Sequence, residues 1–261
     1  MAWGGVALFN TGYQIPQTIS VVLLSGFQGM YTPMFAHLLV TPDTLRTAYQ
    51  EVIKVYAVLF IPAAAGLLVM LGDYIPLVYG PAFAPAVPIA QILTVAFLVE
   101  TFLDLGGILL TTAALARPVL LAQSLVVLGA GPFLLAANSG NLVLTAAIFP
   151  AGRLLATLVK HLFARRQFGV QFPWAFLARA SLPSLVMVAV LVPLRLFGGT
   201  SWLKTLLLTV LGVVLVVVGM RVFRVLGPRE LDLLKRAQIP GSTRVLTLLG
   251  RRCGWAKRVG S

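Results

Sequence analysis

The sequence predicts an all-α membrane protein, a polytopic bundle of about seven transmembrane helices. Of its 261 residues, 59% are hydrophobic and 10% are charged, and the mean hydropathy is +0.96. A soluble domain carries about a quarter charged residues, so this chain has too little polar surface to cover itself in water. The apolar residues also come in runs of roughly 20, the length of a spanning helix, whereas barrel strands are shorter and alternate in polarity. Lipid therefore surrounds helices here.

Seven spans can be placed along the chain. Their approximate limits are 4–38, 51–78, 88–115, 118–137, 142–163, 175–197 and 202–223, and 225–261 form a basic tail. The first two contain Pro16 and Pro62, which spanning helices tolerate when neighbours satisfy the backbone. Between them, "TPDTLRTAYQ" is predicted to form a short polar helix at the interface. Its cap is Thr41 or Asp43, since such side chains accept hydrogen bonds from unpaired amides.

The second and third spans are separated by "GDYIPLVYGPAFAPAVPIAQIL", residues 72–93. Tyr79 is an interfacial aromatic, Gly80 permits a turn and Pro81 cannot extend a helix. Pro88 is acceptable in a first helical turn. These residues predict a tight hairpin outside the cytoplasm.

Orientation follows from the basic residues in short connections. The connection between spans five and six carries Lys160, Arg165, Arg166 and Arg179, and cytoplasmic loops are enriched in such residues. Alternation from there places the N-terminus outside and the C-terminus in the cytoplasm. We expect the basic tail to be attracted to anionic lipids, or alternatively to dock an enzyme of polysaccharide assembly.

Two segments resemble known proteins. "GVALFNTGYQIPQTISVVLLSGFQGMYTPMFAHL" is similar to the eighth span of Wzx-type oligosaccharide flippases, which belong to the MOP (MATE-like) superfamily. "YAVLFIPAAAGLLVMLGDYIPLVYGPAFAPAVPIAQIL" resembles their ninth span more closely, and "GPRELDLLKRAQIPG" resembles their C-terminal segment. The matching positions in the ninth span are Pro62, Gly66, Ile75 to Gly80, Phe83, Ala86 and Ile92-Leu93.

The resemblance implies the C-terminal half of a MATE-like carrier of about fourteen helices in two lobes. Such a carrier moves a polyprenyl-diphosphate-linked oligosaccharide from the inner to the outer leaflet of the cytoplasmic membrane by alternating access. Since this chain begins inside the eighth span, we expect a truncated or split reading frame. Its partners would then be the bilayer, the lipid-linked oligosaccharide and a missing N-terminal lobe.

Three ionisable residues fall deep inside predicted spans, where each costs on the order of 3 kcal/mol on insertion scales. Glu100 and Asp104 lie four residues apart in span three, and so share one helical face. Arg153 lies in span five at a depth similar to that of Asp104. One interpretation is an Asp104–Arg153 ion pair that locks two helices. The other is a cavity wall, where Arg153 binds the diphosphate and Glu100 or Asp104 binds a coupling proton or cation.

Other polar residues have structural interpretations. We expect Lys160 and His161 to reach the headgroups, His37 to lie at the interface and Asp73 to be solvated at the outer face. A set of glycines is predicted to permit close packing of helices. It comprises Gly106, Gly107, Gly129, Gly131 and Gly212.

The remaining function classes have less support. The net charge of +13 is concentrated beside apolar runs and in the tail, without the aromatic interleaving of a nucleic-acid surface. Cys253 is the only cysteine, so no cysteine metal cluster is expected, and we expect no cofactor. No long outer loop carries paired His, Asp or Arg, so we expect no enzyme. A drug or lipid-precursor exporter of the same superfamily and a non-transporting scaffold remain alternatives.

Overall fold

The computed structural model describes residues 3–197 and 201–223, with the side chains of residues 3 and 23–28 excepted. Over these residues the chain is helical. The helices are α1 (Trp3–Leu38), α2 (Pro42–Tyr79), the 3-10 helix η1 (Pro81–Ala86), α3 (Val87–Thr112), α4 (Ala116–Asn138), α5 (Leu142–Ile148), α6 (Ala151–Phe168), α7 (Trp174–Leu196) and α8 (Trp202–Val222).

Six described segments are long and apolar enough to cross a membrane. They are Pro42–Tyr79, Pro81–Thr112, Ala116–Asn138, Leu142–Phe168, Trp174–Leu196 and Trp202–Val222. Helix α1, 36 residues long, occupies the first predicted span. The chain is therefore a multi-pass, all-helical membrane protein, as its composition predicts.

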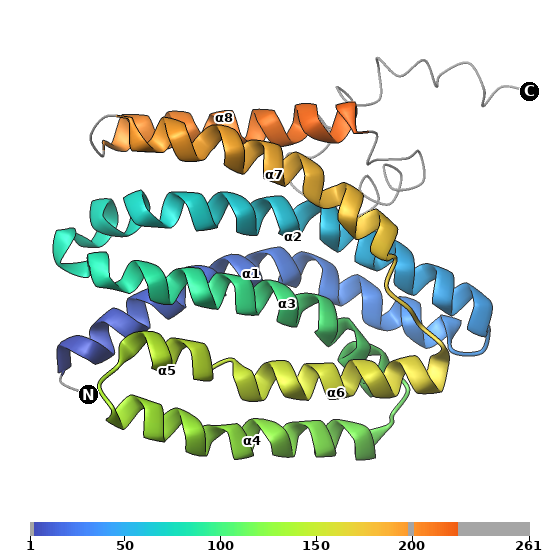
Figure 1. Ribbon diagram of the computed structural model, residues 1–261. Helices are drawn as coiled ribbons and strands as arrows, with labels where there is room; N and C mark the ends of the chain where they lie inside the picture. The colour runs from blue at the N-terminus through green and yellow to red at the C-terminus, as the bar shows by residue number, and fades with distance from the viewer. Residues whose placement is uncertain (1–2, 198–200, 224–261) are drawn as a thin grey trace, which may run out of the picture.

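The long helices run back and forth along one direction (Figure 1). Helix α3 is central and packs most extensively on α6 and α1, with α2 also beside it. Helix α4 covers α6 on one side of the bundle, and the α7–α8 pair lies against α2 on the other. The N-terminus lies at the same end as the turn from α2 to α3 and the turn from α4 to α5.

The turn between α2 and α3 forms as its residues predict. Gly80 adopts φ 93°, a left-handed conformation that favours glycine, and its N–H donates to the carbonyl of Pro76. The 3-10 helix follows at once, with the Phe83 amide donating to the Gly80 carbonyl at 3.1 Å. Pro88 lies in the first turn of α3, where its missing N–H is harmless.

One predicted boundary is wrong. The polar segment after α1 is not a separate interfacial helix, because it is continuous with α2. Leu45, Tyr49 and Ile53 recur on one face of this segment and are buried in the largest hydrophobic cluster. The N-cap residue Thr41 makes no capping bond with its side chain.

The fifth predicted span consists of two helices. Helix α5 ends at Ile148 and α6 begins at Ala151, with Phe149 and Pro150 between them. Proline has no amide hydrogen and so interrupts the helical hydrogen-bond ladder. The Asn141 side chain caps α5 by accepting from the Leu144 amide at 3.1 Å. Helix α6 is thus a separate 18-residue element.

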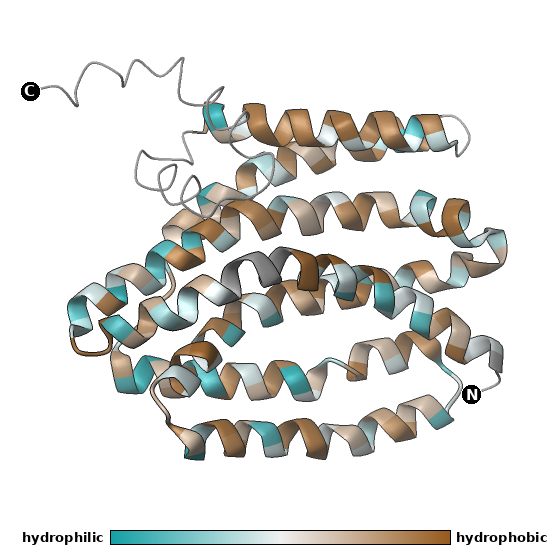
Figure 2. Cartoon of the chain, turned by 180° about the vertical axis from the view of Figure 1, so that it is seen from behind, coloured by the Kyte–Doolittle hydropathy of each residue, from teal (hydrophilic) through white to brown (hydrophobic). Residues whose placement is uncertain are grey.

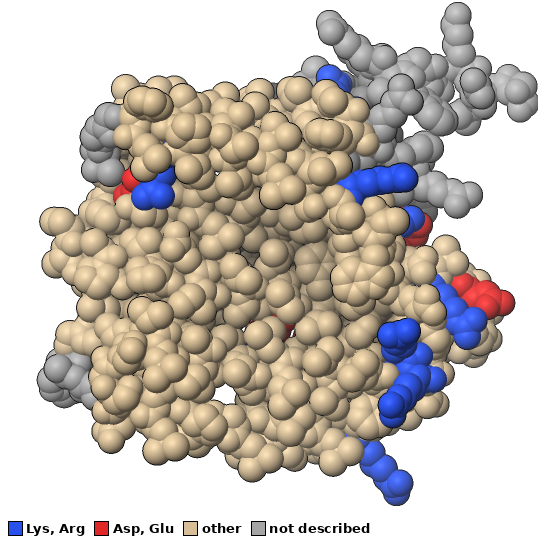
Figure 3. Space-filling view, in the orientation of Figure 1, with Lys and Arg blue, Asp and Glu red and all other residues tan. Residues whose placement is uncertain are grey.

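The basic residues of the described chain gather at one end of the bundle, called here the basic end (Figure 3). This is the end where α1 meets α2, α3 meets α4 and α6 leads to α7. Its residues include Arg46, Arg117, Arg165, Arg166, Arg179 and Arg221. At the opposite end lie Arg195 and Lys204. Between the two ends the outer helices are mostly hydrophobic, as α8 shows in Figure 2.

Candidate functional site

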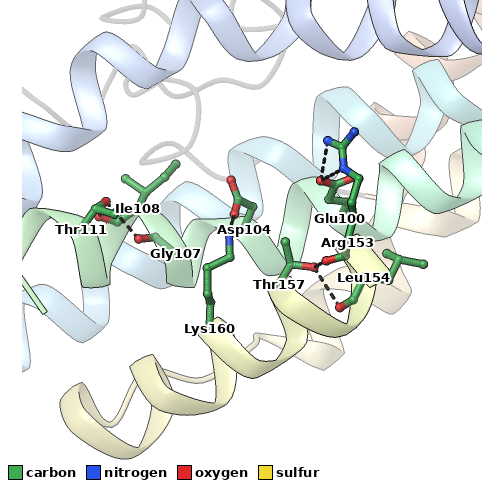
Figure 4. A network of polar contacts seen from close by, with 9 residues as sticks. All are labelled: Glu100, Asp104, Gly107, Ile108, Thr111, Arg153, Leu154, Thr157 and Lys160. Carbon is green, nitrogen blue, oxygen red and sulfur yellow. Dashed lines mark hydrogen bonds and ion pairs between the residues drawn. The ribbon is translucent and has the colours of Figure 1, made fainter. Parts of the chain in front are cut away.

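Four charged side chains meet where α3 packs against α6, and we call this set the charged seam (Figure 4). Helix α3 supplies Glu100 and Asp104, and α6 supplies Arg153 and Lys160. Spacings of four and seven residues bring each pair to one face of its helix. The seam therefore runs along a helix–helix contact, from Arg153 in the first turn of α6 to Lys160 two turns further along.

The first ion pair of the seam joins Arg153 to Glu100. The Nε and Nη2 atoms of Arg153 donate to the same carboxylate oxygen, Glu100 Oε1, at 3.0 and 2.8 Å. The other oxygen, Oε2, is buried and accepts no hydrogen bond within the described part of the chain. The guanidinium also lies 5.7 Å from the ring centre of Phe97. Glu100 thus has one buried carboxylate oxygen that has no hydrogen-bond partner among the described residues.

The second ion pair joins Lys160 Nζ to Asp104 Oδ1. The predicted Asp104–Arg153 pair is therefore wrong, since each of these residues has a different partner. Glu100 and Asp104 differ by one helical turn, about 6 Å along the axis, and the depth argument did not resolve that difference. The expectation that Lys160 reaches the headgroups is also wrong, because α6 places it two turns after Arg153 on the seam.

Each ion pair has one largely covered and one accessible member. The side chains of Glu100 and Lys160 are 15% and 19% exposed, whereas those of Arg153 and Asp104 are 39% and 40% exposed. Charged residues in spanning helices face the bundle interior or a water-filled space. The accessible guanidinium and carboxylate can therefore meet a charged ligand without separation of α3 from α6.

Glycines allow the two helices to approach this closely. A Cβ atom at Gly106 would lie 2.8 Å from the Cα of His161, and one at Gly107 would lie 3.0 Å from Lys160 Nζ. Gly129 of α4 meets Gly152 of α6 in the same way, at 2.9 Å from its Cα. The packing role predicted for Gly106, Gly107 and Gly129 is thus confirmed.

The two other predicted packing glycines behave differently from each other. Gly212 of α8 packs against Leu191, whose Cδ1 would lie 3.1 Å from an added Cβ. Gly131 has nothing within 4 Å of an added Cβ, so the prediction is wrong there.

His161 is a residue whose position the sequence did not reveal. It is buried, and its Nδ1 lies 3.2 Å from the Tyr49 hydroxyl of α2. Its ring also lies 4.5 Å from the Phe172 ring. The expected headgroup position is therefore wrong, and His161 connects α6 to α2 instead. His161 and Tyr49 are 112 residues apart in the sequence, so the spacing of nearby residues could not predict this contact.

Asp73 is likewise not solvated. It is buried and accepts from Arg195 Nε of α7 at 3.0 Å. Lys204 of α8 donates to the carbonyls of Arg195 and Phe197, both at 2.7 Å. These contacts tie α2, α7 and α8 together at the end opposite the basic end. Among the described residues, no three His, Cys, Asp or Glu side chains are grouped so as to hold a metal.

Comparison with known protein families gives a match to part of the chain. A family model described as "Polysaccharide biosynthesis protein" matches residues 4–88. The matched region covers α1, α2 and the turn into α3, which are the segments whose motifs show the resemblance. No curated protein and no solved structure matches the chain. The match supports a membrane protein of polysaccharide biosynthesis.

The matched region and the charged seam do not coincide. All four seam residues follow residue 88, so a role for the seam has to be argued from its geometry. The tail segment "GPRELDLLKRAQIPG" and the rest of the basic tail lie outside the described residues.

Proposed function

We propose that this chain forms one lobe of a carrier that moves polyprenyl-diphosphate-linked oligosaccharide across the cytoplasmic membrane. The family match supports polysaccharide biosynthesis, and the multi-pass helices support a role within the bilayer. The charged seam is the observation that carries the proposal. A lipid-linked sugar needs compensating groups for its phosphates at bilayer depth, because unpaired polar groups are costly there.

In this proposal Arg153 binds the diphosphate. Its guanidinium is permanently charged and has a planar set of donors that fits phosphate oxygens. A single carboxylate oxygen of Glu100 holds the guanidinium of Arg153, and the exposed part of this guanidinium is open to an anion. Phosphate and carboxylate would then compete for the same donors.

Glu100 and Asp104 are the proposed coupling groups. When an anion draws Arg153 away, Glu100 loses the cation that stabilises its charge, and it would take up a proton or a small cation. Asp104 has an accessible carboxylate beside Lys160 and offers a second position for such an ion. Substrate binding and ion binding would then be linked through the same seam.

The orientation in this proposal follows the basic end. Cytoplasmic connections are enriched in Lys and Arg, so the basic end faces the cytoplasm and the N-terminus faces outside. A second lobe, encoded upstream or as a separate chain, would complete the carrier. Rocking of the two lobes would expose the seam to each side of the membrane in turn.

A leaflet-transfer assay in lipid vesicles tests the proposal. The protein, with any lobe encoded upstream in frame, is reconstituted with a fluorescent polyprenyl-diphosphate oligosaccharide, and transfer between leaflets is followed by a membrane-impermeant quencher. We expect Arg153→Gln to reduce the rate at least tenfold. The control variant Arg179→Gln removes an exposed arginine outside the seam and should leave the rate unchanged. Equal rates for folded wild type and Arg153→Gln would contradict the proposal.

Cysteine labelling tests the orientation independently. In a Cys253→Ser background, Ser139→Cys and Arg166→Cys should react with an impermeant reagent from opposite sides of the membrane. Reaction from the same side would overturn the proposed threading of the chain.

A further inference from the structure

Helix α1 carries a stripe of uncharged polar residues on the side turned away from the protein. The stripe comprises Asn10, Gln14, Gln17 and Thr18, and we call it the amide stripe. Asn10, Gln14 and Thr18 are exposed, and Gln17 is partly exposed. Steps of three and four residues place all four on one side of the helix.

The opposite side of α1 is packed against the rest of the bundle. Gly12 lies against Ile89 of α3, where an added Cβ would be 2.8 Å from the Cγ2 atom. Tyr13 meets Phe97 edge to face with ring centres 5.8 Å apart, and Ile15 is buried. Within the described chain, the side chains of the amide stripe make no hydrogen bond with other protein groups.

An exposed amide stripe is costly if it faces lipid. The transfer of a carboxamide from water into hydrocarbon without a hydrogen-bond partner costs several kcal/mol of free energy. Gln14 lies eleven residues after Trp3, about 16 Å along α1, and in the proposed threading of the chain this position lies within the bilayer. The stripe therefore faces water or polar groups and not acyl chains.

Helix α8 shows what a lipid-facing surface of this protein looks like. Its exposed positions are mostly leucine and valine, among them Leu206, Leu207, Val210 and Val214. Thr209 is also exposed, but its hydroxyl donates to the Thr205 carbonyl of its own helix. Hydrophobic colour runs along α8, whereas α1 is mixed (Figure 2). The two helices thus present faces suited to different surroundings.

Residue size argues against a close, glycine-type helix contact at the stripe, and leaves a hydrogen-bonded contact with a polar partner. Packed helix interfaces in membranes use small residues, as Gly129 and Gly152 do between α4 and α6. Asn and Gln are longer and provide both donors and acceptors without charge. Such side chains suit neutral hydroxyl groups better than phosphates or apolar helices.

We propose that the amide stripe of α1 lines the water-filled path of the carrier and hydrogen-bonds to the sugar hydroxyls of the lipid-linked oligosaccharide. This assignment rests on the proposed function, in which the diphosphate binds at the charged seam. The stripe and the seam then recognise different parts of one substrate, the neutral sugars and the charged headgroup.

Cysteine accessibility tests the water-lined face. In the Cys253→Ser background, Gln14→Cys and Thr18→Cys are compared with Val214→Cys. Helix α8 begins at the same end of the bundle as α1, and Val214 lies twelve residues after its start, so the control has a similar depth along its helix. A water-soluble thiol reagent should label the α1 cysteines at least tenfold faster than Val214→Cys. Equally slow labelling at all three positions, in protein that purifies as a folded species, would overturn the proposal and favour a stripe covered by another polypeptide.

Protection by substrate tests the sugar contact. Vesicles contain either a polyprenyl diphosphate that bears an oligosaccharide or the same lipid diphosphate without sugar. The sugar-bearing lipid should slow labelling of Gln14→Cys several-fold, and the bare lipid should not. If the two lipids slow labelling equally, or if neither does, the sugar contact is wrong.

The outcomes separate this inference from the proposed function. Leaflet transfer that depends on Arg153, without protection of Gln14→Cys by sugar, would retain the carrier and reject the sugar contact. Absence of any leaflet transfer by the wild type would reject the carrier and the sugar contact together. If the α1 cysteines are still labelled fast in that case, the only remaining conclusion is that the amide stripe faces water.

Discussion

The pairing within the charged seam gives the sharpest test of the structure. Arg153 donates twice to Glu100, and two unit charges 4 Å apart attract by about 4 kcal/mol at an effective dielectric constant of 20. Desolvation opposes this attraction, and solvent screens an arginine that is 39% exposed. We therefore expect a net coupling free energy of about 1–2 kcal/mol between the two side chains.

The two single substitutions should differ in cost. Arg153→Gln leaves the covered Glu100 carboxylate unpaired and should lower the free energy of unfolding by about 2–3 kcal/mol. Glu100→Gln leaves an arginine that solvent can partly reach, so a loss of about 1 kcal/mol is expected. The free energies are measured by reversible unfolding in mixed micelles titrated with sodium dodecyl sulfate.

A double-mutant cycle then decides between the pairing in the structure and the pairing predicted from depth. Glu100 and Arg153 should couple by more than 1 kcal/mol, and Asp104 and Arg153 by less than about 0.5 kcal/mol. A larger coupling energy for Asp104 and Arg153 than for Glu100 and Arg153 would show that α3 and α6 pack in a different register. The described ion pairs of the seam would then be wrong.

Four further substitutions can be measured by the same titration. Gly106→Ala should cost about 1–3 kcal/mol because its Cβ meets the backbone of His161, and an unchanged stability would contradict the close contact. Gly131→Ala, with open space around it, should stabilise by up to about 1 kcal/mol, and a loss of similar size would show an unseen contact. Tyr49→Phe should cost about 1 kcal/mol by removing the bond to the histidine, whereas no loss would indicate that water replaces it. Asp73→Asn should cost about 2–4 kcal/mol because its arginine partner on α7 loses its counter-charge, and a smaller effect than at an exposed aspartate would argue against that pair.

Local chemistry made much of the fold predictable. The turn from α2 to α3 depends on a glycine, two prolines and an aromatic that lie within residues 79–88, so its position could be predicted from the sequence. Most helix limits lie within a few residues of the predicted spans for the same reason. The exceptions are instructive, because the start of α2 is polar on one face only and its buried face is visible only after the helix is packed.

The partners of the charged residues could not be predicted in this way. Asp73 and Arg195 are 122 residues apart, and a carboxylate beside a turn has no local feature that distinguishes a solvated from a buried position. In the seam, the sequence identified Glu100, Asp104 and Arg153 as unusual. It did not identify Lys160, because a lysine near a helix end is ordinarily explained by its reach to the headgroups. Register between helices decides these cases, and register is a tertiary property.

The polar contacts also indicate which parts of the bundle can move. Helix α2 is joined to α6 through Tyr49 and His161 near the basic end, and to α7 through Asp73 and Arg195 near the other end. Opening either contact would leave a buried polar group without its partner, which costs more than the contact itself contributes. Movement within the helix bundle is therefore opposed at both ends of α2.

The amide stripe on α1 is different, because no contact inside the described chain holds its side chains. In the proposed carrier, this bundle should therefore move as a rigid lobe against whatever faces α1, and the contacts of the charged seam should stay unchanged. We therefore expect labelling rates at Gln14→Cys to change between transport states while those at Val214→Cys remain constant. A constant rate at Gln14→Cys during active transport would place the moving surface elsewhere on the lobe.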